Sequence, residues 1–556
     1  MGQEQDEEDC CAAQASGMYR HSGRACLSFH HYVRPLCTAG PGTVVSKRKC
    51  APEGADRSGP GDSVANVILV YPVTGLDVRG VTVWLPLSVL TVASTLTGDY
   101  EVVIVDQRTD PDWRESISRH LTRDTLCVGI SSMTGTQIRY GLKAAEWTRR
   151  IAPDLPIVWG GNHPTLLPEQ TARHPLVDIV VMGEGEATFR SLVNAFKAGR
   201  DWKTTANIAF KKGEGVAVQG SGYDFVDPGA MPELPYELID VENYVSGNLL
   251  FGHKVRSLPF ITSSGCPYAC TFCCQPVLSN RRWRRMDPDM VVERTFALKE
   301  RYDLDAIEFH DEEFFVDRLR GARIAERIGG AFDWYAQTRM DDLLEVDLAK
   351  LERCGMRSLQ LGLESGSNRV LDLVKKQETV EQYRAANTAL ARTGIQATYN
   401  FMMGFPTETE EELKATVRLV LELTASNPNA YVAGFYVFVP YPGSALYDLA
   451  LANGFRPPES LSGWSQFNRH NIAAPWIEDK THMEFLMVTS KLIDGRRLRG
   501  GLGVPWPAKE VLGLLSRRYR SRWEAHALAM TWDAKLLSMF TRRFLSGESF
   551  LSSTRP

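Results

Sequence analysis

The sequence lacks several features that would fix its class at once. No run of about 18 apolar residues occurs among the 556 residues, so we expect no membrane-spanning helix. The net charge is only −4, which predicts neither a nucleic-acid binder nor a membrane-surface binder. The opening residues, MGQEQDEEDCCAAQ, lack the apolar core of a secretory signal. These absences together predict a cytoplasmic protein in a reducing compartment.

Residues 1–62 lack helical and strand periodicity and are rich in Gly, Ser, Arg and charged residues. We expect a disordered tail there. Its cysteines have spacings that match no metal-ligand pattern, so a passive tail is favoured over a metal site. These cysteines are Cys10, Cys11, Cys26, Cys37 and Cys50.

Residues 63–205 alternate buried-strand patterns with helical ones. The strands are expected at 64–72, 100–107, 125–133, 155–164 and from 177, with helices near 85–96 and 140–150. This alternation predicts an α/β domain with a doubly wound parallel sheet, whose ligands lie at the carboxyl ends of the strands. The motif G-x-G-x-x-G is absent after the first strand, which weakens a dinucleotide-binding interpretation.

A second α/β series follows a linker at 206–254. Strands are expected within 259–265, 304–312, 332–339, 358–366, 395–406 and 431–442, with helices such as 291–301 and 380–392. Six successive βα units predict a partial (β/α)6 barrel over 255–453, with functional residues at the carboxyl ends of its strands.

Residues 454–556 predict a helical C-terminal region with several tryptophans and basic runs. An anionic substrate would suit its basic runs, although an amphipathic helical region with a solvated basic face is the simpler interpretation.

The stretch GCPYACTFCCQ, residues 265–275, follows the first strand of this second series. A disulfide, a zinc ion and a catalytic cluster are the three candidates for its cysteines. A reducing compartment disfavours the disulfide, and zinc would need a second cysteine pair that is not nearby. The spacing C-x3-C-x2-C of Cys266, Cys270 and Cys273 suits a [4Fe–4S] cluster with one iron left open.

This motif resembles the signature of the radical S-adenosylmethionine (SAM) superfamily. The resemblance implies that Cys266, Cys270 and Cys273 bind the cluster and that its open iron chelates SAM. Cleavage of SAM then gives a 5′-deoxyadenosyl radical, which removes a hydrogen atom from substrate. Phe272 would lie against the adenine, whereas Cys274 has no such role and is interpreted as packing.

Elements at the ends of later strands extend the resemblance over residues 255–450. By this resemblance, Glu364 or Ser365 in QLGLESG contacts the SAM ribose. Glu312 in FHDEEFF lies near the methionyl group, and Arg339 in YAQTRMD faces the SAM carboxylate or the substrate. The segments NFMMGFPTET and VFVPYPGS would allow close approach of SAM and flank its adenine. For each acid, a salt bridge at the barrel mouth is an equal alternative. The residues concerned are Glu364, Ser365, Glu312, Arg339, Gly404 and Val439.

Residues 64–200 resemble the cobalamin-binding domain of cobalamin-dependent radical SAM enzymes, through GGNHPTLLPE and VVMGEGEATF. Arg79 stands where related loops place a cobalt-binding histidine, which implies that this loop gives cobalt no histidine. Arg79 then lies below the corrin or at the surface. His163 is expected to form a hydrogen bond in the cofactor pocket or to be structural. The other candidate contacts are Ser131, Ser132, Gly160, Gly161, Gly183, Glu184, Gly185 and Glu186, although Glu184 and Glu186 are equally expected as acids at the start of a helix.

The resemblance implies a C-methyltransferase that acts on an unactivated carbon of a small metabolite, with [4Fe–4S], SAM and cobalamin as cofactors. A cyclase, rearrangement or oxidation enzyme with the same cofactors is the alternative, and a non-catalytic cobalamin or iron–sulfur sensor is a third class. No RNA-binding domain is found, which weighs against tRNA as substrate. A flavodoxin or ferredoxin is the expected transient electron donor. The resemblance also implies that residues 454–556 cap the barrel and shape the substrate site.

Overall fold

The computed structural model describes residues 65–75, 83–247, 255–467, 474–493 and 506–544. The predicted tail at 1–62 and Arg79 lie outside these residues. Residues Asp62–Pro556 form one compact unit. No helix in the described ranges is long and apolar enough to cross a membrane.

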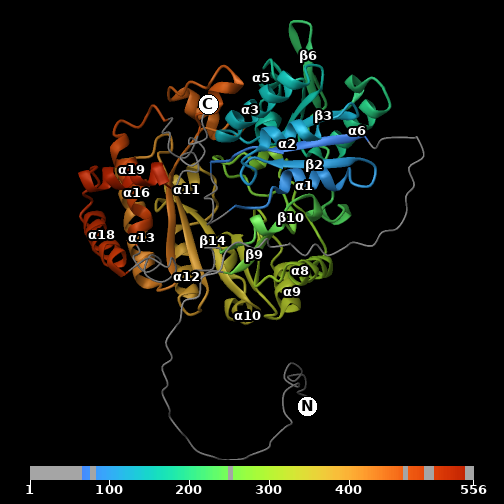
Figure 1. The fold of residues 1–556 in the computed structure, drawn as a ribbon. Helices are drawn as coiled ribbons and strands as arrows, with labels where there is room; N and C mark the ends of the chain where they lie inside the picture. Colours follow the sequence, from blue (N-terminus) through green and yellow to red (C-terminus); the bar gives the residue numbers. More distant parts are fainter. Residues whose placement is uncertain (1–64, 76–82, 248–254, 468–473, 494–505, 545–556) are drawn as a thin grey trace, which may run out of the picture. The chain divides into compact units, whose positions relative to one another are not determined.

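The first sheet has the strand order β2-β1-β3-β4-β5-β6-β7 (Figure 1). Strands β1 to β5 are mutually parallel, which confirms the predicted doubly wound sheet, and β6 and β7 are antiparallel. These last two strands lie in the predicted linker. They are short and contain lysine, glycine and glutamine, so their sequence gives no apolar strand pattern. The strands are β1 (Asn66–Tyr71), β2 (Glu101–Asp106), β3 (Thr125–Ser131), β4 (Ile157–Gly160), β5 (Ile179–Val181), β6 (Ile208–Lys212) and β7 (Gly215–Gln219).

Helices cover both faces of this sheet. Val67 and Leu69 of β1 share an apolar core with α1 and α6, whereas Ile68 and Val70 share another with α2 and α3. Because β1 is buried on both faces, it is apolar at nearly every position and does not alternate. The helices are α1 (Leu87–Ser94), α2 (Trp113–His120), α3 (Thr136–Ile151), α4 (Asn162–Leu166), α5 (Pro168–Ala172) and α6 (Gly185–Lys197).

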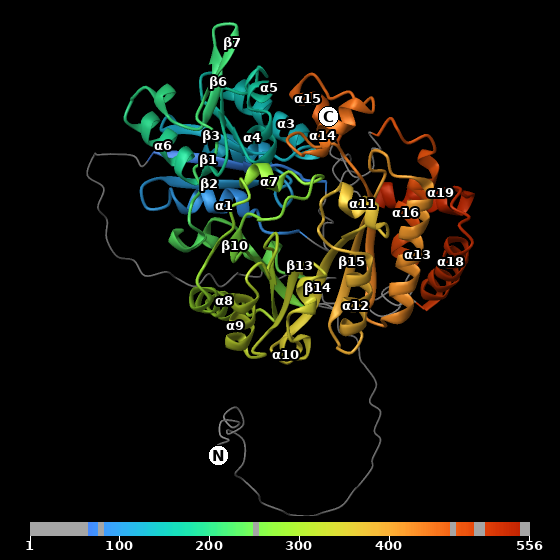
Figure 2. The same cartoon turned by 180° about the vertical axis from the view of Figure 1, so that it is seen from behind.

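The second sheet has the order β16-β15-β14-β13-β12-β9-β8, and its six longer strands are parallel. This confirms the predicted partial barrel, with helices along its outer side (Figure 2). The short strand β8 adds an antiparallel edge. The elements are β8 (Ser246–Gly247), β9 (Arg256–Phe260), α8 (Pro288–Tyr302), β12 (Ala306–Phe309), α9 (Arg318–Ile328), β13 (Asp333–Thr338), α10 (Leu348–Arg353), β14 (Met356–Glu364), α11 (Asn368–Leu373), α12 (Val380–Leu390), β15 (Gln396–Met403), α13 (Glu410–Ser426) and β16 (Ala430–Val437).

The two faces of the barrel sheet differ in polarity. On β14, Leu359, Leu361 and Leu363 belong to the large apolar core under the helices, and Ser358 and Gln360 alternate with them. The same alternation on the other strands gives the opposite face a polar character. Polar residues at these positions are Ser257, Glu308, Tyr335, Gln337, Gln396, Thr398 and Asn400. A closed barrel normally fills its interior with branched aliphatic side chains, so this polar inner face indicates space for ligands.

The C-terminal region is helical, as predicted, and contacts both sheets. Trp464 packs against His163 of the first domain with ring centroids 5.8 Å apart, and its Nε1 donates to Gln170 Oε1 at 2.7 Å. Trp476 donates to the Gly404 carbonyl oxygen of the barrel at 3.0 Å. The helices are α14 (Leu446–Ala452), α15 (Leu461–Trp464), α16 (Lys480–Ile493), α18 (Trp506–Glu524) and α19 (Trp532–Phe544).

Candidate active site

The cysteine loop follows β9 and lies between β10 (Ser263–Ser264) and α7 (Gln275–Leu278). Cys266, Cys270 and Cys273 are free, half-buried thiols. Burial raises the pKa of Cys266 to about 11 and that of Cys273 to about 12, and neighbouring thiols add to both shifts. In the described part of the chain, no three His, Cys, Asp or Glu side chains are grouped for one metal ion. A cluster places each thiolate on a different iron, so three adjacent but separate thiols fit it.

Two hydrogen bonds fix the middle of the cysteine loop to the segment after α11. The Thr271 amide donates to the Val374 carbonyl oxygen at 2.9 Å, and the Thr271 hydroxyl donates to the Leu373 carbonyl oxygen at 3.2 Å. Within the loop, the Gln275 amide donates to Cys273 Sγ at 3.4 Å. Amide donation to sulfur stabilises a thiolate ligand, so this contact also fits a cluster.

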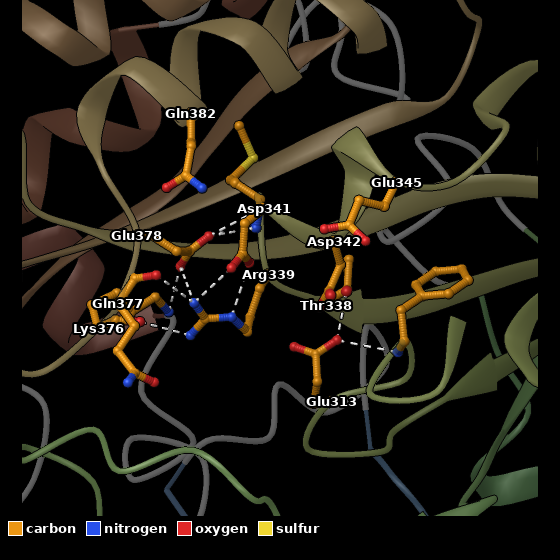
Figure 3. Close-up of polar contacts among 12 residues, drawn as sticks. Glu313, Thr338, Arg339, Asp341, Asp342, Glu345, Lys376, Gln377, Glu378 and Gln382 are labelled. Carbon is orange, nitrogen blue, oxygen red and sulfur yellow. Dashed lines mark hydrogen bonds and ion pairs between the residues drawn. The ribbon is translucent and has the colours of Figure 1, made fainter. Parts of the chain in front are cut away.

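Arg339 is buried and bonded on every side of its guanidinium (Figure 3). Its Nε and Nη2 donate to the Asp341 carboxylate at 2.9 and 3.0 Å, and its Nη1 donates to the Lys376 carbonyl oxygen at 2.8 Å. The guanidinium also lies 4.1 Å from the Tyr268 ring centroid. These contacts tie Arg339 to the cysteine loop through Tyr268, and its predicted contact with SAM or substrate stays a prediction.

Lys376 and Glu378 complete this cluster, and sequence reasoning missed both. The Lys376 ammonium lies 3.2 Å from Glu364 and 3.5 Å from Glu378. Glu378 accepts from the Met340 and Asp341 amides at 2.8 and 3.0 Å. They follow α11 in the sequence KKQE, which resembles any exposed charged turn, so no local signal distinguishes them.

Glu364 and Ser365, the predicted ribose contacts, face different ways. Glu364 ends β14 with a φ of 62°, a strained value for a residue that is not glycine, and pairs with Lys376. Ser365 is fully buried, and its hydroxyl lies 3.2 Å from that of Thr416 on α13. Glu364 thus lies beside Lys376 and Ser365 beside α13, and the ribose contact of either residue stays a prediction.

The acids of FHDEEFF have distinct surroundings. Asp311 accepts from Thr262 and Ser263 and supports the start of the cysteine loop. Glu313 accepts from the Thr338 hydroxyl at 2.5 Å, and burial raises its pKa to about 8 (Figure 3). Glu312 accepts from Gln275 Nε2 at 2.5 Å and lines the cavity described below, with its pKa raised by burial to about 7. Glu312 is therefore the acid placed to meet a ligand.

The predicted adenine contacts gather at the ends of β15 and β16. Phe272 packs on Phe405 with centroids 6.1 Å apart, and Val439 packs against the same apolar core. Gly404 has a φ of 73°, and a Cβ there would lie 2.6 Å from Ile477 Cδ1. The positive φ favours glycine at this position, and the close approach of SAM to Gly404 stays a prediction.

The predicted cobalamin contacts lie at the carboxyl ends of β3, β4 and β5. The Ser131 hydroxyl lies 2.9 Å from that of Ser88 on α1, while Ser132 is fully buried. A Cβ on Gly161 would lie 2.7 Å from the Ser132 carbonyl oxygen. A Cβ on Gly183 would collide with the Gly222 carbonyl oxygen, whereas Gly160 and Gly185 have no neighbour closer than 3.4 Å. Only Gly160 and Gly185 therefore leave space beside the backbone.

His163 is a fully buried side chain, and burial lowers its pKa to about 4, so the ring is neutral. Its Nδ1 lies 2.9 Å from the Thr134 hydroxyl, and its Nε2 has no partner among the described residues. Contact with Trp464 favours the structural role that the sequence left open.

A cavity of about 510 Å³ lies between the carboxyl ends of the two sheets. Glu184 binds Arg284 at its rim, with Oε2 2.7 Å from Nη1, and accepts from the Val226 amide at 2.8 Å. Glu186 also lines this cavity; its Oε2 is buried and has no hydrogen-bond partner within the part of the chain that the structure describes, and burial raises its pKa. An orphan acceptor of this kind fits the amide side chains of cobalamin. Other lining residues include Ser88, Thr165, Gly265, Gln275 and Glu312.

Comparisons with known proteins agree with this geometry. Residues 260–420 match the radical SAM superfamily, and residues 76–193 match the B12 binding domain. An uncharacterised methyltransferase from Pyrococcus horikoshii is 30% identical over 397 residues, covering 70% of this chain and 84% of the relative. The anaerobic magnesium-protoporphyrin IX monomethyl ester cyclase of Rubrivivax gelatinosus is 28% identical, covering 68% of each chain.

A solved structure shares the fold. The cobalamin-dependent radical enzyme OxsB, with aqua-cobalamin and SAM bound, superposes with a TM-score of 0.65 at 17% identity, covering 86% of this chain and 75% of OxsB. The chain therefore belongs to the radical SAM superfamily as a cobalamin-dependent enzyme, with a [4Fe–4S] cluster, SAM and cobalamin as its cofactors.

Proposed function

We propose that this enzyme transfers a methyl group to an unactivated carbon of a small metabolite. The observation that carries the proposal is the cavity lined by both halves of the chain. Glu186 and Thr165 come from the first sheet, and Gly265 and Gln275 come from the cysteine loop. One substrate carbon can lose a hydrogen atom and receive a methyl group only if the radical source and the methyl carrier both lie next to it. The methyltransferase relative also supports methyl transfer.

The cofactors supply hydrogen-atom abstraction and methyl transfer, and the chain supplies placement and exclusion of water. In this proposal Cys266, Cys270 and Cys273 bind the cluster. Glu364, Glu312 and Phe272 contact SAM. Glu186 accepts hydrogen bonds from the corrin amides. A flavodoxin or ferredoxin supplies electrons in a reducing cytoplasm, and neither nucleic acid nor membrane is a partner.

The deciding experiment is anaerobic reconstitution with cluster and cobalamin, followed by reductant, methyl-labelled SAM and a small-molecule extract of cells that express the gene. Mass spectrometry then follows 5′-deoxyadenosine, S-adenosylhomocysteine and labelled cobalamin. We expect all three together with a labelled metabolite. A preparation that retains no cobalamin would contradict the proposed role of the first domain.

A cyclisation, rearrangement or oxidation without methyl transfer is the second candidate, because the cyclase of Rubrivivax gelatinosus is also a relative. The same experiment separates the two. Formation of 5′-deoxyadenosine in response to the extract, with cobalamin left unmethylated, would favour this candidate.

A further inference from the structure

The polar inner face of the barrel contains a buried carboxylate that no predicted cofactor contact uses. The Glu308 side chain on β12 is 1% exposed. Its Oε1 accepts from the Ser257 hydroxyl at 2.6 Å, and its Oε2 lies 3.0 Å from His310 Nε2. His310 directly follows β12, and its contact with Glu308 brings the two side chains together on the inner side of the sheet. A buried carboxylate with two such partners has a fixed position.

His310 lies at the barrel mouth between two aromatic rings. Its centroid is 5.9 Å from that of Trp84, which precedes α1 of the first domain, and 5.6 Å from that of Tyr335 on β13. The side chain is 20% exposed. A residue from the cobalamin-binding half thus covers a histidine of the radical half, so His310 lies where the two halves meet.

The Glu308 contact assigns the protons of the His310 ring. An ionised carboxylate only accepts hydrogen bonds, so Nε2 carries the hydrogen. In the neutral ring Nδ1 is then an acceptor with a free lone pair. None of the described residues bonds to Nδ1, and Nδ1 is not among the buried unpartnered atoms. A carboxylate that orients an imidazole in this way prepares it to accept a proton.

We propose that His310 Nδ1, which lies where the two halves meet but outside the lining of the 510 Å³ cavity, accepts the hydrogen bond, and during the reaction the proton, of a hydroxyl or amino group that the substrate carries beside its reacting carbon. The proton moves from that oxygen or nitrogen to Nδ1 and returns on product release, so no electrons are exchanged. An oxygen or nitrogen that shares its proton with a base weakens the adjacent C–H bond. This inference rests on the proposed function only in the last step, in which the carbon radical receives a methyl group.

Chemical modification of the full-length wild-type chain tests the free lone pair. Diethyl pyrocarbonate reacts with accessible, unprotonated imidazole nitrogens, and peptide mass spectrometry locates the adducts. We expect reaction at His310 and at the partly exposed His482, and none at the fully buried His163. A His310 that stays unmodified while His482 reacts would overturn the proposal.

A matched pair of variants tests the role in turnover. His310→Asn keeps an acceptor near the Nδ1 position and loses the Glu308 contact, whereas His310→Gln reaches Glu308 and loses the acceptor. The readout is the 5′-deoxyadenosine formed in response to the extract, together with labelled product. We expect roughly a hundredfold loss in His310→Gln and about tenfold in His310→Asn, since acid–base groups contribute about 10²–10⁴-fold.

A purely structural histidine would give the opposite order, because Gln preserves the contact that fixes Glu308. His310→Gln at least as active as His310→Asn would therefore refute the assignment. Failure of the proposed function is distinguishable: wild-type enzyme would form 5′-deoxyadenosine in response to the extract but no methylated product. The order of the two variants in that response would still decide the role of His310.

Discussion

Removing the Arg339 guanidinium should loosen the turn that supports the cysteine loop. Arg339→Met deletes four donated hydrogen bonds, two to Asp341 and one each to the Lys376 and Gln377 carbonyl oxygens. It also leaves Glu378, which is fully buried, with one cation fewer. Breaking a buried ion pair costs about 3–5 kcal/mol. The lower value corresponds to roughly a hundredfold increase in the fraction of molecules in which this turn is locally unfolded.

Hydrogen exchange followed by mass spectrometry measures that population directly. In Arg339→Met we expect peptides covering 368–378 and 266–275 to exchange about a hundredfold faster, because Thr271 links the two segments. Arg323→Met is the control, since Arg323 is 57% exposed and pairs with Asp289 at the surface. Exposed pairs contribute about 0–1 kcal/mol. Equal exchange rates in the two variants would refute the view that the buried network holds the loop.

Further predictions concern other parts of the chain. Cys266→Ala should reduce iron and sulfide content to near zero, whereas Cys274→Ala should retain both; loss of iron from Cys274→Ala would make Cys274 a ligand. Trp464→Ala should lower the free energy of unfolding by about 3–5 kcal/mol, because Trp464 is 1% exposed, while Trp532→Ala, at 73% exposed, should change it by less than about 0.5 kcal/mol. Denaturant unfolding followed by circular dichroism checks both, and similar midpoint shifts would contradict the described docking of Trp464. Burial raises the pKa of Glu408 to about 7, so its contribution to stability is complete below about pH 4.5 and is lost as the pH rises to about 7. Glu408→Gln should therefore raise the free energy of unfolding relative to wild type more at pH 8 than at pH 5, with a difference of at most about 3 kcal/mol between the two effects, and an equal effect at both values would refute the assignment.

Local patterns were sufficient for the strands and for the cysteine motif. The buried run at Asn66–Tyr71 and the alternation on Met356–Glu364 predict strands directly, because strand periodicity depends on which faces are covered. The strands at Ile208–Lys212 and Gly215–Gln219 were missed. Their pairing with β5 depends on a neighbouring edge, which the short, partly polar segments do not encode.

The sequence did not predict which residues contact the site residues in most cases. Arg339 contacts Lys376 and Gln377 across 37 and 38 positions, and Glu184 binds Arg284 across 100. Each is an ordinary charged residue in a loop or at a helix end, with no periodicity around it. Such pairs form only when the strands bring their ends to one edge.

The sequence by itself determined the cysteine triad, the two α/β series and their order, since these depend on spacing and periodicity along the chain. The tertiary structure alone decided which polar groups meet. It placed Glu308 against His310 and Ser257, turned Ser365 toward α13, and left Glu186 Oε2 at the cavity with no partner among the described residues. The physical reason is that side-chain contacts arise from strand register and helix packing, and a burial pattern specifies a face but not the neighbour across it.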